Sequence, residues 1–146
     1  MNRVTVVLLG VLIGVAGFVD AADSSSNMPV LNTAVEHFKT SGIAMSEAVH
    51  FTAGKDLNDD GFDTLEMVKE LHQDPKTLEV LYSFRLWRQK NVEQTKRRLK
   101  MGRLFNWDMT AAGTIVLEWM EGSQKNEVLK AFESFRKQQG LNKTTE

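Results

Sequence analysis

The stretch at residues 74–87, DPKTLEVLYSFRLW, decides how the fold of this chain is interpreted. Its Pro75 suits the first turn of a helix, where the missing backbone N–H costs no hydrogen bond. Val80, Phe84 and Trp87 then recur at spacings of four and three residues, which places them on one face of a helix. The stretch therefore predicts an amphipathic helix with one buried face.

The same periodicity extends over the rest of the chain. Before this stretch, Leu65, Val68 and Leu71 repeat at helical spacing, and no segment alternates with a period of two. We therefore expect an all-α fold, a small bundle of four to six helices over residues 31–140. Further helical stripes are Val35 with Phe38, Ala44 with Ala48 or Met45 with Val49, Ala112 with Val116, Trp119 and Met120, and Val128 with Phe132 and Phe135.

Residues 1–21 have the composition of a cleaved signal peptide. A basic start at Arg3 precedes an apolar run over residues 4–18, which is shorter than the roughly 20 residues that a spanning helix needs. We expect a secreted protein with no stable membrane span after cleavage, a polar linker at 22–30 and a flexible tail at 141–146. The chain has no cysteine, so packing alone must stabilise it.

Residues 56–66, DLNDDGFDTLE, match the first half of an EF-hand loop. Asp56, Asn58 and Asp60 occupy the first three ligand positions, and a glycine follows as the motif requires. Glu66 arrives one residue too early for the bidentate position, which leaves two interpretations. One is a calcium site formed by Asp56, Asn58, Asp60 and Glu66; the other is a polar turn whose carboxylates cap a helix over residues 62–72.

A basic segment follows an acidic one. Residues 22–84 carry eleven acidic side chains and four basic ones, whereas residues 85–103 carry eight basic side chains and one acidic one. The candidate partner-binding residues are Arg88, Lys90, Lys96, Arg97, Arg98, Lys100 and Arg103. By default the segment is a solvated charged face. If it binds a ligand, the expected ligand is an acidic protein partner, with a nuclear-import-like cluster at residues 96–100 as the alternative. Nucleic acid is not expected, because the whole chain is not basic and few aromatic residues interleave the cluster. Membrane docking is not expected either, because the segment lacks an apolar face.

Motifs for catalysis are missing from the sequence. The three histidines lack metal-binding spacing, and a single Glu47-x-x-His50 has no second copy of the kind that di-iron bundles use. There is no nucleophile elbow and no phosphate-binding glycine loop. We therefore expect a non-enzymatic protein without a cofactor, apart from the calcium alternative.

Two segments carry a family resemblance. Residues 119–132, WMEGSQKNEVLKAF, resemble the tryptophan-containing helix, turn and following helix of WY-type domains in secreted oomycete effectors, and residues 74–81 are similar to the same turn-to-helix entry. The Arg-x-Leu-Arg motif of those effectors is absent, and Tyr82 precedes Trp119 instead of following it. The resemblance implies a small helical effector that is delivered into a host cell and binds host proteins. We accordingly expect a secreted, non-catalytic protein that acts by protein–protein binding.

Overall fold

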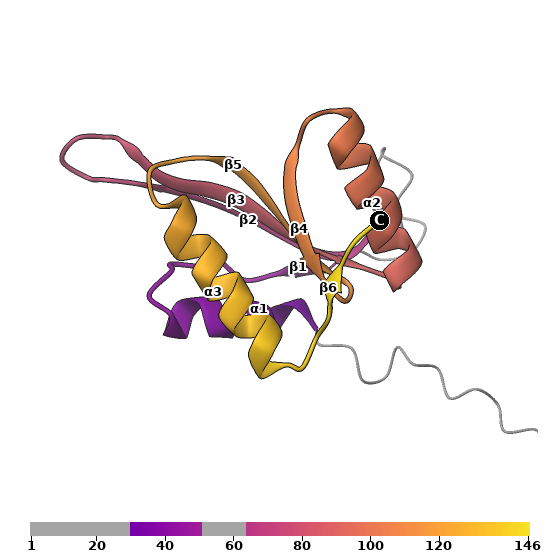
Figure 1. Cartoon of the computed structure of the whole chain (residues 1–146). Helices are drawn as coiled ribbons and strands as arrows, with labels where there is room; N and C mark the ends of the chain where they lie inside the picture. The colour runs from indigo at the N-terminus through magenta and orange to yellow at the C-terminus, as the bar shows by residue number, and fades with distance from the viewer. Residues whose placement is uncertain (1–29, 51–63) are drawn as a thin grey trace, which may run out of the picture.

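The fold is a three-layer arrangement of helices on both faces of an antiparallel sheet (Figure 1). A computed structural model describes residues 30–50 and 64–146, and these residues form three helices and six strands. The strand order is β1-β2-β3-β5-β4-β6, and every neighbouring pair is antiparallel. Along the chain the elements are α1 (Leu31–Thr40), β1 (Val49–His50), β2 (Thr64–Gln73), β3 (Val80–Gln89), α2 (Val92–Leu104), β4 (Asp108–Ala112), β5 (Ile115–Glu121), α3 (Lys125–Gln138) and β6 (Lys143–Thr144).

The expected all-α bundle is wrong, and β2 shows the physical reason. Of the expected helical stripe, Val68 is buried, whereas Leu71 is 57% exposed. The inward-facing positions of β2 follow the period of two of a strand, but two of them carry Glu66 and Glu70. Because buried positions are rarely acidic, these glutamates hide the alternation in the sequence.

The strand β3 was mistaken for a helix for a different reason. Tyr82, Phe84 and Leu86 face one side of the sheet, and Trp87 faces the other, and all four are buried. A central strand that is covered on both faces shows no polar alternation. The strand β5 is likewise buried at four consecutive positions, 115–118, so its run of apolar residues fits helical spacing equally well.

Two clusters of buried side chains occupy the two faces of the sheet. The helices α1 and α3 cover one face, and α2 covers part of the other (Figure 1). The smaller cluster lies between α2 and the sheet and contains Trp87, Leu99, Ala111 and Val116. The larger cluster contains Leu31, Ala34, Val35, Phe38, Ile43, Val68, Tyr82, Phe84, Leu86, Ala112, Ile115, Leu117, Val128, Ala131, Phe132 and Phe135.

Some expected helices are present. Val35 and Phe38 lie on the buried face of α1, and Val128, Phe132 and Phe135 lie on that of α3. The expected helical segment at residues 44–49 is not a helix; it has no regular secondary structure before β1 begins at residue 49. The helical expectations therefore hold where one face packs on the sheet and the other meets solvent, which is the case that a helical stripe describes.

Candidate functional site

The expected partner-binding residues do not form one surface. Arg98 is 2% exposed, its Cζ lies 4.2 Å from the centroid of the Trp87 ring, and its Nη2 donates to Thr64 Oγ1 at 3.1 Å. Arg88 lies between strands, where its Nη1 is 3.1 Å from Glu66 Oε2. Arg98 therefore joins α2 to the sheet, and Arg88 joins β3 to β2, so both arginines offer little to an external partner.

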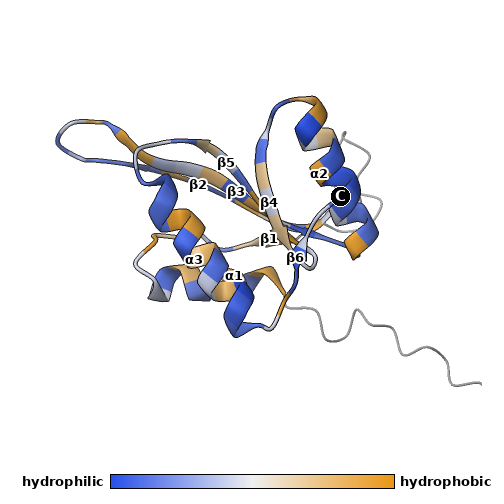
Figure 2. Cartoon of the chain, in the orientation of Figure 1, coloured by the Kyte–Doolittle hydropathy of each residue, from blue (hydrophilic) through white to orange (hydrophobic). Residues whose placement is uncertain are grey.

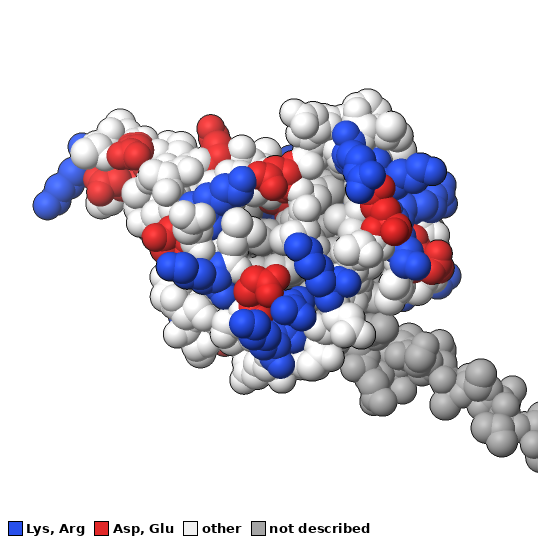
Figure 3. Space-filling view, viewed as in Figure 1, with Lys and Arg blue, Asp and Glu red and all other residues white. Residues whose placement is uncertain are grey.

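The remaining basic residues lie at the surface. Lys90 precedes α2 and is exposed. On α2, Lys96 Nζ is 3.4 Å from Glu93 Oε1, whereas Arg97 and Lys100 are exposed. Figure 3 shows these Lys and Arg side chains gathered over α2. The outer face of α2 is thus cationic, with Glu93 as its acidic member within the helix.

The helix α2 has clear local determinants. Asn91 Oδ1 accepts a hydrogen bond from the backbone N–H of Gln94 at 2.9 Å, which caps the N-terminus. Near the other end, a Cβ on Gly102 would lie 2.7 Å from Met109 Sδ. A glycine at this position therefore lets the helix approach β4 closely. The buried face of α2 comprises Thr95, Arg98, Leu99 and Gly102.

Exposed apolar side chains lie at the last residue of α2 and in the loop that follows it. Leu104 is 70% exposed, Phe105 59% and Trp107 44%. The rings of Phe105 and Trp107 stack with their centroids 5.3 Å apart. Figure 2 shows the hydrophobic colour at this end of α2. We call these three residues the apolar loop.

The apolar loop is held in one conformation by its own backbone. The N–H of Phe105 donates to Met101 O at 3.1 Å, and the N–H of Trp107 donates to Gly102 O at 2.7 Å. Asn106 adopts φ of 57°, a left-handed conformation that asparagine tolerates better than most residues. The exposed rings are therefore presented by a hydrogen-bonded turn.

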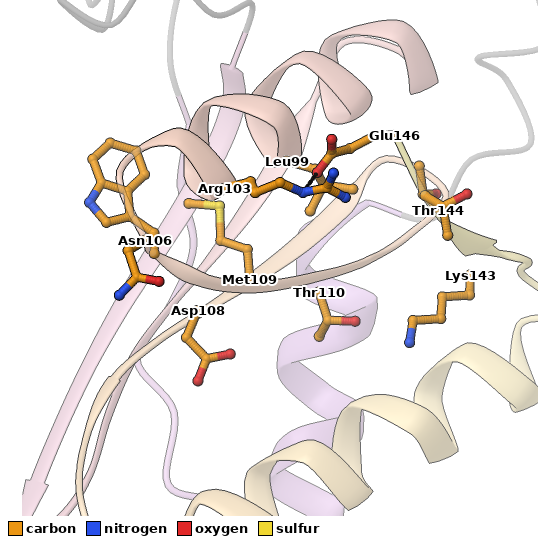
Figure 4. Close-up of a pocket in the computed structure, with 11 residues that line it drawn as sticks. Leu99, Arg103, Asn106, Asp108, Met109, Thr110, Lys143, Thr144 and Glu146 are labelled. Carbon is orange, nitrogen blue, oxygen red and sulfur yellow. Dashed lines mark ion pairs between the residues drawn. The ribbon is translucent and has the colours of Figure 1, made fainter.

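Two hollows flank Trp107. The first has a volume of about 410 Å³ and lies between the end of α2, β4 and the C-terminal residues (Figure 4). In it Arg103 Nε is 2.9 Å from Glu146 Oε1. The second has a volume of about 490 Å³. It is lined by Arg85, Asn106, Trp107, Asp108, Glu118, Trp119 and Met120.

The expected calcium ligands cannot be compared as a set. Asp56, Asn58 and Asp60 lie outside the described residues. Glu66 belongs to β2, where its Oε2 accepts from the Leu31 backbone N–H at 2.8 Å and pairs with Arg88. The structure thus uses Glu66 to attach the start of α1 to the sheet. Among the residues that the structure describes, no three His, Asp or Glu side chains are close enough to share a metal ion.

The resolved pKa shifts have local structural causes. Hydrogen bonds from the backbone N–H groups of Thr77 and Lys76 lower the pKa of Asp74 in the β2–β3 turn. Burial raises the pKa of Tyr82, whose hydroxyl accepts from the Ala44 N–H at 2.9 Å. A hydrogen bond to Glu36 raises the pKa of Lys39. None of these groups lines either hollow.

Comparison of the chain with protein-family models, with curated proteins and with solved structures found no match. The WY-type resemblance also meets a structural difference, because the segment around Trp119 that it treats as a helix is the strand β5. In residues 30–50 and 64–146, no helix is long and apolar enough to cross a bilayer. The site must therefore be interpreted from its own geometry.

The sequence interpretation missed the apolar loop, although a signal was present. Three large apolar residues occur within four positions, 104–107, directly after the basic segment. They were not assigned to any helical stripe, and in the structure they do not join the core. We call the apolar loop together with the outward Arg97, Lys100 and Arg103 the α2 corner.

Proposed function

We propose that this chain is a secreted, non-catalytic protein that acts by binding an acidic partner through the α2 corner. The observation that supports this proposal is the clustering of exposed apolar side chains. Among the described residues, eight large hydrophobic side chains are exposed, and three of them are Leu104, Phe105 and Trp107. A contiguous apolar patch on a folded surface is typical of an interaction site, whereas scattered exposed residues are not.

The energetic argument follows from burial. Burying a leucine or aromatic side chain that is otherwise exposed to water gains about 1.5–3 kcal/mol. The turn that carries the apolar loop is already hydrogen-bonded, so binding orders few new backbone torsions. A preorganised apolar loop therefore favours binding.

The charge of the α2 corner indicates the chemistry of the partner. Arg97 and Lys100 are exposed, and they lie seven and four residues before Leu104, which places all three on one stripe of α2. A surface with cations beside an apolar patch favours binding to a partner that presents negative charges next to apolar groups. An acidic protein meets this description, as does any other surface of the same chemistry. The signal-like composition of residues 1–21 supports export of the chain.

A photo-crosslinking experiment tests the proposal. A benzophenone amino acid replaces Phe105 in one variant and Leu78 in a control variant, and the secreted protein is irradiated with a whole-cell homogenate that includes membranes. Leu78 is a suitable control because it is 70% exposed at the tip of the β2–β3 hairpin, away from the α2 corner. We expect adducts from position 105 and few from position 78. Equal yields at the two positions would reject the α2 corner as the contact surface.

A further inference from the structure

We infer that the partner of the α2 corner is an anionic lipid surface, into which Leu104, Phe105 and Trp107 insert at the level of the headgroups. This inference rests on the proposed function and names its partner. The sequence alone argued against membrane docking because the basic segment has no apolar face. In the structure the apolar loop that directly follows this segment is exposed, which removes this objection.

The shape of the α2 corner favours a lipid surface. The loop between α2 and β4 projects at one extremity of the molecule, and its atoms form an uncharged cap there (Figures 1 and 3). A projecting apolar cap needs a recess in a protein partner, whereas a bilayer interface accommodates it without one. Trp107 suits the interface particularly well, because an indole has an apolar body and a polar N–H.

The spacing of the charges along α2 suits the same orientation. A helix rises about 1.5 Å per residue, so Lys100 and Arg97 lie roughly 6 and 10 Å from Leu104 along the axis. Their long side chains can reach headgroup phosphates while the apolar loop inserts more deeply. The cations therefore lie at headgroup level when the rings are buried.

The acidic neighbours leave the α2 corner cationic. Glu93 is paired with Lys96, and Glu146 is paired with Arg103. Asp108, which follows the apolar loop, pairs with Lys125. These pairs compensate the nearby carboxylates within the protein. Lys100, which is exposed on α2, then adds positive potential on this side of the molecule toward an anionic surface.

Vesicle binding tests the inference directly. The protein secreted by an expressing cell is sedimented with vesicles of phosphatidylcholine, or with vesicles that also contain about 30% phosphatidylserine. We expect the partition coefficient to be about tenfold higher on the anionic vesicles and to fall as salt is raised. Equal binding to both vesicle types would overturn the electrostatic part of the inference and with it the assignment to an anionic surface.

Matched variants assign the binding to residues. Leu104→Asn should lower the partition coefficient at least about tenfold, since the leucine no longer gains from burial. Leu78→Asn, at an equally exposed position on the hairpin, should leave it unchanged. Lys100→Glu should lower it several-fold, whereas Lys130→Glu on α3 should not. An equal partition coefficient for a variant and its control would overturn the inference. The same result is expected if a retained leader causes the binding.

Tryptophan fluorescence supplies a second measurement. Brominated lipids should quench Trp107 on binding, and Trp107→Phe should remove most of that quenching, because Trp87 is buried and Trp119 is half-buried. Quenching that persists in the variant would overturn insertion by this residue. If vesicles do not bind but position 105 still crosslinks to a protein, the lipid inference fails and the proposed function stands. If neither occurs, both fail.

Discussion

Arg98 lies over the indole ring of Trp87, with its Cζ 4.2 Å from the ring centroid, and is 2% exposed. The pair joins α2 to the central strand β3 across the smaller core cluster. A buried guanidinium over an aromatic face gains a desolvated cation–π interaction. Arg98 thus belongs to the interior of the protein, although its neighbours Arg97 and Lys100 are exposed.

The first prediction concerns this pair. Arg98→Ala should lower the free energy of unfolding by about 2–4 kcal/mol, because it opens a cavity and removes the bond to Thr64. Lys100→Ala, two residues away and exposed, should change it by less than about 0.5 kcal/mol. Urea denaturation followed by circular dichroism measures both. Similar unfolding midpoints for the two variants would contradict the structural role of Arg98.

Glu66 is the subject of the second prediction. Glu66→Gln should destabilise the protein by about 1–3 kcal/mol, because the Arg88 guanidinium loses its buried counter-charge and the Leu31 N–H loses a charged acceptor. Glu36→Gln serves as the control, since its ion pair with Lys39 is exposed. If neither Glu66→Gln nor Glu36→Gln shifts the midpoint of the unfolding transition, Glu66 does not anchor α1 as described.

The third prediction concerns the turn between β5 and α3. Gly122 has φ of 123°, and a Cβ there would lie 2.5 Å from Leu81 O. Gly122→Ala should therefore cost more than about 2 kcal/mol from backbone strain and steric overlap together. Gly42→Ala, at φ of 84° with nothing within 4 Å of the new Cβ, should cost about 1 kcal/mol from strain alone. Thermal unfolding measures the loss of stability in each variant, and the difference between the two losses gives the steric contribution at Gly122.

The fourth prediction uses the single tyrosine of the chain. Burial raises the pKa of Tyr82 above its usual 10.0, so the folded state holds the phenolic proton more tightly than the unfolded state. The stability that this provides is complete below the unfolded pKa of about 10 and is lost as the pH rises through the folded pKa. The near-ultraviolet absorbance of the phenolate should therefore titrate at higher pH in native protein than in denaturant.

Tyr82→Phe supplies the control for the alkaline titration. The variant lacks the phenolic proton, so the part of the alkaline loss of stability that belongs to Tyr82 should disappear. It should also lose the hydrogen bond from the Ala44 N–H, which lowers stability at neutral pH by roughly 1 kcal/mol. Coincident titrations of native and denatured protein would contradict the burial of this phenol.

Part of the fold could be predicted from the sequence. The helices α1 and α3 were recognisable, because each has one apolar stripe and one solvated face. The strands were not. On β2, Glu66 and Glu70 occupy inward positions and are satisfied by the backbone N–H groups of Leu31 and Ser46, residues that lie far away in the sequence. Their burial depends on partners that no local pattern contains.

The candidate site was predictable only in part. The basic composition of residues 85–103 was visible in the sequence, but the division between buried and exposed cations was not. Arg97 and Arg98 are adjacent in the chain, yet one faces solvent and the other faces Trp87. That division depends on which face of α2 packs on the sheet, and the sheet itself was not foreseen.

The sequence by itself determined that the chain has no cysteine, that an acidic segment precedes a basic one, and that two segments form amphipathic helices. Only the tertiary structure decided that the middle of the chain is a sheet and that the apolar loop stands exposed beside outward cations. The physical reason is that periodicity records which side chains avoid water, whereas strand pairing and the burial of charged groups depend on contacts between residues distant in the chain.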